Sequence, residues 1–295
     1  MVVMLLWGSL YPVVKLGYKY LEINTGSVPD IMMFAGNRFL VCGSIITLLA
    51  FGRGDRLDKD VRRSIWPVIS MGMTGVVLHY VLNYTSLTMT DSGRAAILKA
   101  AGPLLYICLS FLFMRDERFS AGKIFGALLG FAGIAAMNAD ADAGFSIHTG
   151  DLLMIGASLA GILSNLSGKK AMVCNSPFVV TGVSQLFGGV VLTLTAALLH
   201  AQVMHVSRAG LLVFGYICLA SIVAYLIWYR IMKLIPLSEM YLIKFAEPVF
   251  ACVFGAICLG ENIFRVQYLL AFVLICSGVM IGQAKQERRR CESAD

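Results

Sequence analysis

Ten apolar runs, each about twenty residues long, follow one another along almost the whole chain of 295 residues. An α-helix needs ~20 apolar residues to cross ~30 Å of hydrocarbon, so each run is long enough to span a membrane. Only 14% of the residues are charged, against about 25% in soluble domains. The sequence therefore predicts an all-α membrane protein with about ten transmembrane helices. The expected spans are 1–20, 30–51, 65–87, 93–114, 122–138, 150–171, 177–199, 209–231, 237–259 and 265–284.

The basic residues collect in alternate loops between these runs. If the N-terminus is inside, 16 of the 24 Lys and Arg residues fall at cytoplasmic ends and four fall on the opposite side. This bias is typical of cytoplasmic loops and predicts a multi-pass protein of the cell membrane with both termini cytoplasmic. Met1 leads directly into the first apolar run, so no cleavable signal peptide is expected. The net charge of +7 follows from this topology, with the lipid bilayer and not nucleic acid as the expected partner.

The second half of the chain repeats the first at a displacement of 145 residues. The matched pairs are Tyr80 and Tyr225, Tyr84 and Tyr229, Lys99 and Lys244, and Pro103 and Pro248. A displacement by five helices reverses the second copy in the membrane, which is the inverted-repeat plan of secondary transporters. We therefore predict a first five-helix repeat over 1–140, a second over 150–285 and a basic cytoplasmic tail over 286–295.

Several stretches resemble a known family. They are LLWGSLYPVVK at 5–15, AILKAAGPLLY at 96–106 with FLFMRDERFSAGKIFGALLGFAGI after it, GDLLMIGASLAGIL at 150–163, and IKFAEPVFACVFGAICLGENIFRVQYLLAFVLICSGVMIG at 243–282. Together they resemble the EamA domain of the drug/metabolite transporter superfamily, over nearly the whole chain and in both copies. The resemblance implies a ten-helix fold and the export or exchange of small metabolites, and it implies no particular substrate.

Ionisable side chains inside spans are costly, and each is therefore a candidate for function. The chain has Lys15, Arg38, Lys99, Lys244 and Glu247 in such places. Lys99 and Lys244 each precede a proline by four residues, and inverted copies would place them on opposite sides of the midplane. A cavity between the halves would then offer two ammonium groups to a carboxylate or phosphate. Alternatively, Glu247 neutralises Lys244 as an ion pair at i,i+3 spacing or exchanges protons, and Arg38 serves either substrate binding or packing.

Aromatic and polar side chains complete the candidate substrate site. They are His79, Tyr80, Asn83 and Tyr84 on the third span, Tyr225, Trp228 and Tyr229 on the eighth, and Trp7 and Tyr11 on the first. They either hydrogen-bond a metabolite in the cavity or anchor the helices at the membrane interface. Pro12, Pro103 and Pro248 are expected to kink their helices, either exposing carbonyls at the site or simply packing.

Motifs of enzymes and metal sites are missing from the sequence. It has no G-x-x-x-x-G-K-[ST], no H-E-x-x-H and no metal-ligand spacing among its eight cysteines. We therefore expect no catalytic residues, no metal and no cofactor. The predicted function is a secondary transporter of small anionic or zwitterionic metabolites by alternating access, and the alternative is a non-transporting membrane sensor or assembly subunit. Substrate identity, transport direction, coupling ion and oligomeric state are not specified by the sequence.

Overall fold

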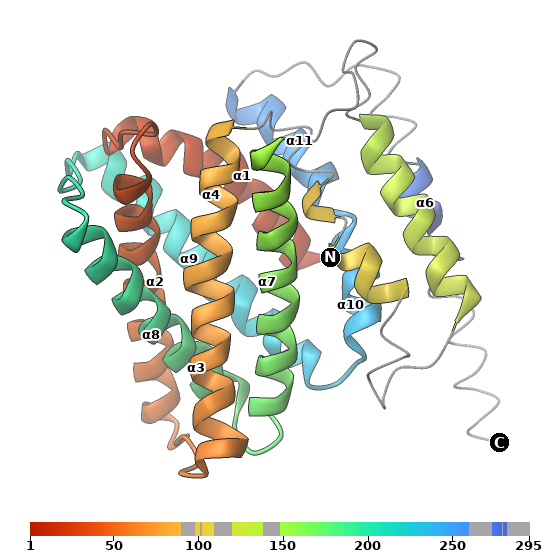
Figure 1. Ribbon diagram of the computed structural model, residues 1–295, viewed down its shortest axis with the longest axis horizontal. Helices are drawn as coiled ribbons and strands as arrows, with labels where there is room; N and C mark the ends of the chain where they lie inside the picture. Colours follow the sequence, from red (N-terminus) through yellow and green to blue (C-terminus); the bar gives the residue numbers. More distant parts are fainter. Residues whose placement is uncertain are drawn as a thin grey trace.

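Long apolar helices make up most of the protein (Figure 1). The computed structural model describes residues 1–89, 98–100, 102–108, 120–137, 148–259, 273–278 and 280–281. The helices are α1 (Val2–Tyr20), α2 (Val28–Gly52), η1 (Val61–Ile65), α3 (Trp66–Gly72), η2 (Met73–Leu78), α4 (His79–Met89), α6 (Ala121–Met137), α7 (Thr149–Ala171), α8 (Pro177–Leu198), α9 (Arg208–Met232), α10 (Leu237–Lys244) and α11 (Glu247–Leu259). Short helical segments also lie at 98–100, 102–108 and 273–278.

The predicted all-α membrane fold is confirmed. Within the described residues there is no strand, and six helices are long and apolar enough to cross a membrane. One of them runs without interruption from Val61 to Ser86 through η1, α3, η2 and α4. Much of the expected spans 93–114 and 265–284 lies outside the described residues, so the count of ten helices stays a prediction.

Serine side chains cap the starts of several long helices, as the sequence before each apolar run favours. Ser27 Oγ accepts a hydrogen bond from Asp30 N at the start of α2, and Ser207 Oγ accepts one from Gly210 N at the start of α9. Ser176 caps α8 and is followed by Pro177, a residue suited to the first helical position because it lacks an N–H group.

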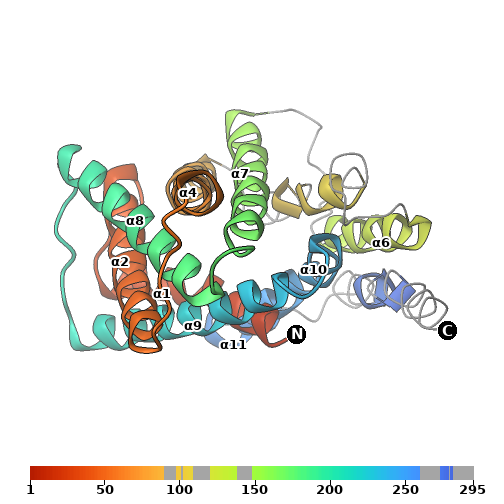
Figure 2. The same cartoon turned by 90° about the horizontal axis from the view of Figure 1, so that it is seen from below.

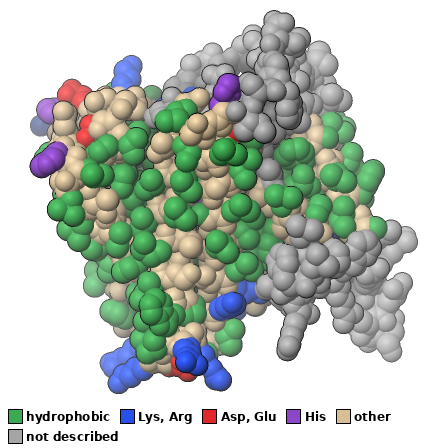
Figure 3. All heavy atoms as spheres, in the orientation of Figure 1, with side chains coloured by type: hydrophobic (Ala, Val, Ile, Leu, Met, Phe, Trp, Pro, Cys, Tyr) green, Lys and Arg blue, Asp and Glu red, His purple; other side chains and the backbone are tan. Residues whose placement is uncertain are grey.

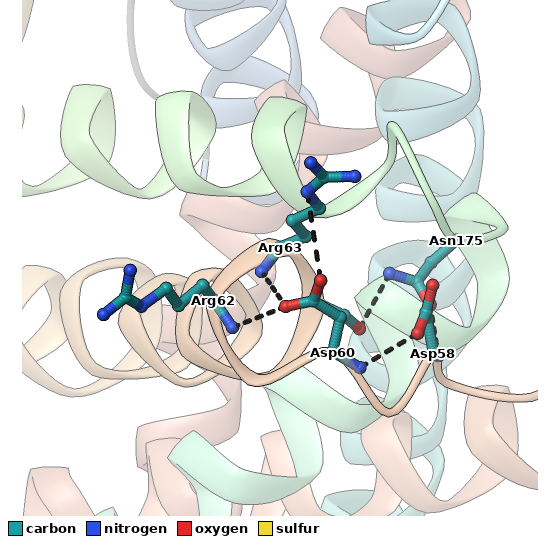
Figure 4. A network of polar contacts seen from close by, with 6 residues as sticks. Asp58, Asp60, Arg62, Arg63 and Asn175 are labelled. Atoms are coloured by element: carbon teal, nitrogen blue, oxygen red, sulfur yellow. Dashed lines mark hydrogen bonds and ion pairs between the residues drawn. The ribbon is translucent and has the colours of Figure 1, made fainter.

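Figure 4 shows the loop contacts at one end of the helices, where α2 passes into η1 and α7 passes into α8. The Asp60 side chain accepts hydrogen bonds from Arg62 N at 2.9 Å and Arg63 N at 3.0 Å, and so caps η1. Asp58 N donates to Asn175 Oδ1 at 2.8 Å, which ties this loop to the one before α8. We call this end of the molecule the basic face because it carries Arg53, Arg56, Lys59, Arg62 and Arg63.

The outer surface between the two ends is largely apolar (Figure 3). Leu48 on α2, Leu194 on α8 and Leu212 on α9 are 70%, 59% and 77% exposed. Large apolar side chains exposed on several neighbouring helices are expected where lipid, not water, surrounds the protein. The protein is therefore a multi-pass membrane protein, whereas the cytoplasmic placement of its basic face stays a prediction.

Helices α2 and α8 lie against each other from opposite halves of the chain (Figures 1 and 2). The same four residue types occur at the same spacing in both helices. They are Gly36, Leu40, Gly43 and Thr47 in α2 and Gly182, Leu186, Gly189 and Thr193 in α8, each 146 residues after its counterpart. A Cβ atom added at Gly36 would stand 2.8 Å from Thr193 N, and one added at Gly182 would stand 2.7 Å from Thr47 N.

The second pair of glycines repeats this reciprocity. A Cβ atom at Gly43 would stand 2.6 Å from Leu186 Cα, and one at Gly189 would stand 2.6 Å from Leu40 N. The contact therefore maps onto itself when the two halves are exchanged, as an inverted repeat requires. Small residues allow this close approach of two backbones, which is how helices commonly pack inside a bilayer.

Replacing Gly43 by leucine should destabilise the protein by at least about 2 kcal/mol, because the new side chain must displace the α8 backbone. The change is measured as a lower midpoint of thermal unfolding in detergent. Gly215→Leu is the matched control, since an added Cβ on this glycine of α9 meets no atom within 4 Å. Equal midpoints for the two variants would contradict a tight α2–α8 contact.

Candidate substrate site

Two tyrosines that the internal repeat makes equivalent meet between α4 and α9. Tyr80 of α4 and Tyr225 of α9 share a hydrogen bond between their hydroxyl groups at 3.2 Å. The Trp7 ring of α1 packs edge-on against Tyr225, with centroids 5.5 Å apart. Trp7 also contacts Trp228, with centroids 5.0 Å apart. These four residues come from helices of both halves, and we call them the aromatic wall: Trp7, Tyr80, Tyr225 and Trp228.

A chain of hydrogen bonds joins three of the predicted site residues. Lys99 Nζ donates to the Tyr11 hydroxyl at 2.9 Å, and that hydroxyl donates to Glu247 Oε1 at 3.0 Å. Glu247 is only 6% exposed, and its second oxygen, Oε2, has no hydrogen-bond partner among the described residues. This carboxylate therefore keeps acceptor capacity at a buried position.

Lys244 and Glu247 lie on either side of a short break between α10 and α11. Helix α10 ends at Lys244, α11 begins at Glu247, and Pro248 is the second residue of α11. Proline fits the first turn of a helix and disfavours helical backbone before it, which accounts for the break. Lys244 Nζ lies 5.2 Å from the centroid of the Trp7 ring and 5.7 Å from that of Trp228, at cation–π distance.

Trp7 and Tyr11 are one helical turn apart on α1, so they bring the charged residues together. Trp7 contacts Lys244, and Tyr11 contacts both Lys99 and Glu247. The group thus contains two ammonium groups and one carboxylate, from elements in both halves of the chain. We call Trp7, Tyr11, Lys99, Lys244 and Glu247 the candidate substrate site.

The buried side chain of Asn165, which was not predicted from the sequence, binds an aromatic residue beside this site. Trp228 Nε1 donates to Asn165 Oδ1 at 3.3 Å, and Asn165 Nδ2 donates to the Tyr241 hydroxyl at 2.8 Å. These bonds connect α7 to α9 and α10. The signal in the sequence was an amide side chain inside an apolar span, where a polar group needs a partner.

Arg38 is bound within the helix packing. It is 3% exposed, and its Nε and Nη2 atoms donate to Ser221 Oγ at 3.1 and 2.8 Å. Its guanidinium carbon lies 5.1 Å from the centroid of Phe39 and 5.8 Å from that of Tyr80. Arg38 therefore connects α2 to α9 behind the aromatic wall.

The remaining predicted residues lie outside the group of five defined above. His79 Nδ1 donates to the Ala157 carbonyl at 2.7 Å, which ties α4 to α7. Tyr84 packs against Tyr80 with centroids 5.3 Å apart, and Tyr229 stacks on Tyr225 at 6.1 Å. Asn83 is buried on α4.

The prolines predicted to kink helices have different surroundings. Pro12 lies inside α1, directly after Tyr11, and α1 continues through it. Pro103 is buried in the short helix over 102–108. Pro248 follows the break between α10 and α11, and the role of the three prolines at the site stays a prediction.

The family model described as the EamA-like transporter family matches residues 1–139 and 148–282. The chain belongs to the EamA-like transporter family. It is 25% identical over 288 residues to the "Uncharacterized inner membrane transporter YedA" of Escherichia coli (strain K12), covering 95% of this chain and 88% of that protein. It is 27% identical over 114 residues to the "Aromatic amino acid exporter YddG" of Ancylobacter novellus, covering 39% of this chain and 38% of that protein.

A solved crystal structure shares the fold, with a TM-score of 0.77 at 22% identity over 99% of this chain and 96% of that one. The relatives are named as transporters and not as enzymes, so this EamA-family protein is a transporter of small molecules. Within the described residues, no group of three His, Cys, Asp or Glu side chains is placed to hold a metal ion.

Replacing Ser221 by alanine should destabilise the protein by about 2 kcal/mol, because the buried Arg38 guanidinium loses the acceptor of two hydrogen bonds. The midpoint of thermal unfolding in detergent measures the effect. Ser44→Ala, a partly buried serine on the same helix as Arg38, should shift stability by less than about 0.5 kcal/mol. An unchanged midpoint in Ser221→Ala would show that Arg38 does not depend on this contact.

Proposed function

We propose that this EamA-family transporter moves small zwitterionic or anionic metabolites by alternating access, with the substrate held at Lys99, Lys244 and Glu247 between the two halves. The observation that carries the proposal is the bonded chain from Lys99 through Tyr11 to Glu247, with Lys244 close beside it. The basic face is the cytoplasmic side in this proposal, as the distribution of Lys and Arg favours.

The charges of the site favour a substrate with a carboxylate. Lys99 and Lys244 outnumber Glu247, so an anionic group brought between the ammonium groups would compensate the excess positive charge. Such compensation matters inside a membrane, where uncompensated charge is costly. A phosphate would satisfy the same requirement.

The Glu247 carboxylate favours a zwitterionic substrate over a purely anionic one. Its Oε2 atom is buried and lacks a hydrogen-bond partner among the described residues. A substrate ammonium group would satisfy this oxygen while the substrate carboxylate engages a lysine. The Trp7 and Trp228 rings offer apolar contact for the remainder of the molecule, and the exporter YddG, which is named for aromatic amino acids, supports the same class.

The division of the site between the repeats supports alternating access. Trp7, Tyr11 and Lys99 belong to the first half, whereas Lys244 and Glu247 belong to the second. Movement of one half against the other would therefore change the access to the charged groups from each side, as in other transporters built from inverted repeats. The predicted repeats 1–140 and 150–285 are the moving units in this proposal.

The lysines are tested by counterflow in proteoliposomes with a panel of zwitterionic, anionic and cationic metabolites. Saturable flux of a zwitterion or anion should fall at least about tenfold in Lys99→Gln and in Lys244→Gln, because each change removes a charge-assisted contact. Lys19→Gln, an exposed lysine near the end of α1, should keep the flux. Cation flux unaffected by both changes would exclude the proposed substrate class, and no flux from folded protein would favour the sensor or assembly subunit.

Glu247 is tested with two substrates that differ only in the amino group, an aromatic α-amino acid and its desamino acid. Glu247→Gln should reduce flux of the amino acid about tenfold more than flux of the desamino acid, because only the former needs the carboxylate. Equal losses for both compounds would assign Glu247 to the structure of the site and remove the argument for zwitterions.

A further inference from the structure

A second polar position lies beside the aromatic wall, between α3 and η2, α7, α8 and α9. A cavity of about 20 Å³ is lined there by Gly75, Ser164, Gln185, Tyr225 and Tyr229, together with Met71 and Val76. Gln185 is 2% exposed. Neither its amide oxygen nor its amide nitrogen has a hydrogen-bond partner among the described residues.

A buried amide without partners is costly, because it has given up its hydrogen bonds to water. The cavity is large enough for a water molecule, which needs roughly 10–15 Å³ and several polar partners. The polar groups around Gln185 suit such a molecule.

The cavity lies beside the candidate substrate site, at a similar depth below the basic face. Tyr225 lines the cavity and also contacts Trp7, which belongs to the substrate site. Gln185 lies eight residues after the start of α8 at the basic face, about 12 Å along the helix axis. Lys244 of the candidate substrate site lies seven residues after the start of α10, about 10 Å along that helix, so the two positions are at similar depth.

We propose that Gln185 lines the substrate route to the basic face, beside the candidate substrate site, and that the cavity is the part of this route that remains in the closed arrangement. The inference rests on the proposed transport function. When Tyr225 and Tyr229 move aside, the cavity joins the basic face and water reaches the Gln185 amide. An amide suits this position because its N–H groups receive a carboxylate and its oxygen receives an ammonium group, without a fixed charge that would retain either.

The test is the accessibility of single cysteines to the membrane-impermeant reagent MTSET, in full-length protein whose native cysteines are otherwise replaced. Gln185→Cys should be modified at least tenfold faster than Ser184→Cys, a neighbouring buried residue of α8 that does not line the cavity. Cys174, an exposed native cysteine in the loop between α7 and α8, marks the basic face. Vesicles of both orientations should show that Gln185→Cys reacts from the same side as Cys174.

The cysteine variants are also labelled in protein that carries a second substitution, because a protein held in the closed arrangement would hide the cavity from the reagent. Asn165→Ala removes the bonds that join α7 to α9 and α10, and it should raise the modification rate at position 185. Ser164→Cys reports on the same cavity from α7 if Gln185→Cys does not fold. The proposal is overturned if neither cysteine reacts faster than Ser184→Cys in either background while Cys174 reacts fully, or if they react from the opposite side. The labelling needs no substrate, so cavity labelling without flux would overturn the proposed function and leave the hydrated cavity in place.

Discussion

The close crossing of α2 and α8 is the contact on which the rest of the structure depends. Two glycines on each helix allow the backbones to approach closely. Gly36 and Gly43 of α2 face a threonine and a leucine of α8, and Gly182 and Gly189 of α8 face the equivalent threonine and leucine of α2. Because the contact is reciprocal, it fixes how the two halves face each other. The meeting of Tyr80 with Tyr225, and of Lys99 with Glu247 through Tyr11, follows from that placement.

Charge inside a membrane sets the second constraint, because each ionised group needs a partner. The protein meets it in two ways. Arg38 has two bonds to Ser221 and lies over aromatic rings, which suits a fixed structural contact. Lys99, Lys244 and Glu247 have partners that leave capacity for a further charged group, and this difference separates a packing residue from a candidate for substrate binding.

Much of the fold and part of the site could be predicted before any contact was known. The apolar runs gave the α2, α7, α8 and α9 spans to within a few residues, and the repeat paired Lys99 with Lys244. The ion pair of Lys244 and Glu247 at i,i+3 spacing stays a prediction, and the helix is interrupted between them at Phe245 and Ala246. Gln185 and Asn165 gave weaker signals, because one amide in an apolar run does not indicate which helix it faces.

The sequence by itself determined that this protein lies in a lipid bilayer and is built from repeated helical halves. Hydrophobic length, basic loops and an internal repeat are properties of segments along the chain. Tertiary structure alone decided which polar residues meet. Tyr11 lies between Lys99 and Glu247, and Gln185 faces a cavity, only because helices distant in sequence cross at particular depths and rotations. Helix periodicity fixes the face on which a residue lies, but the packing of backbones fixes what that face touches.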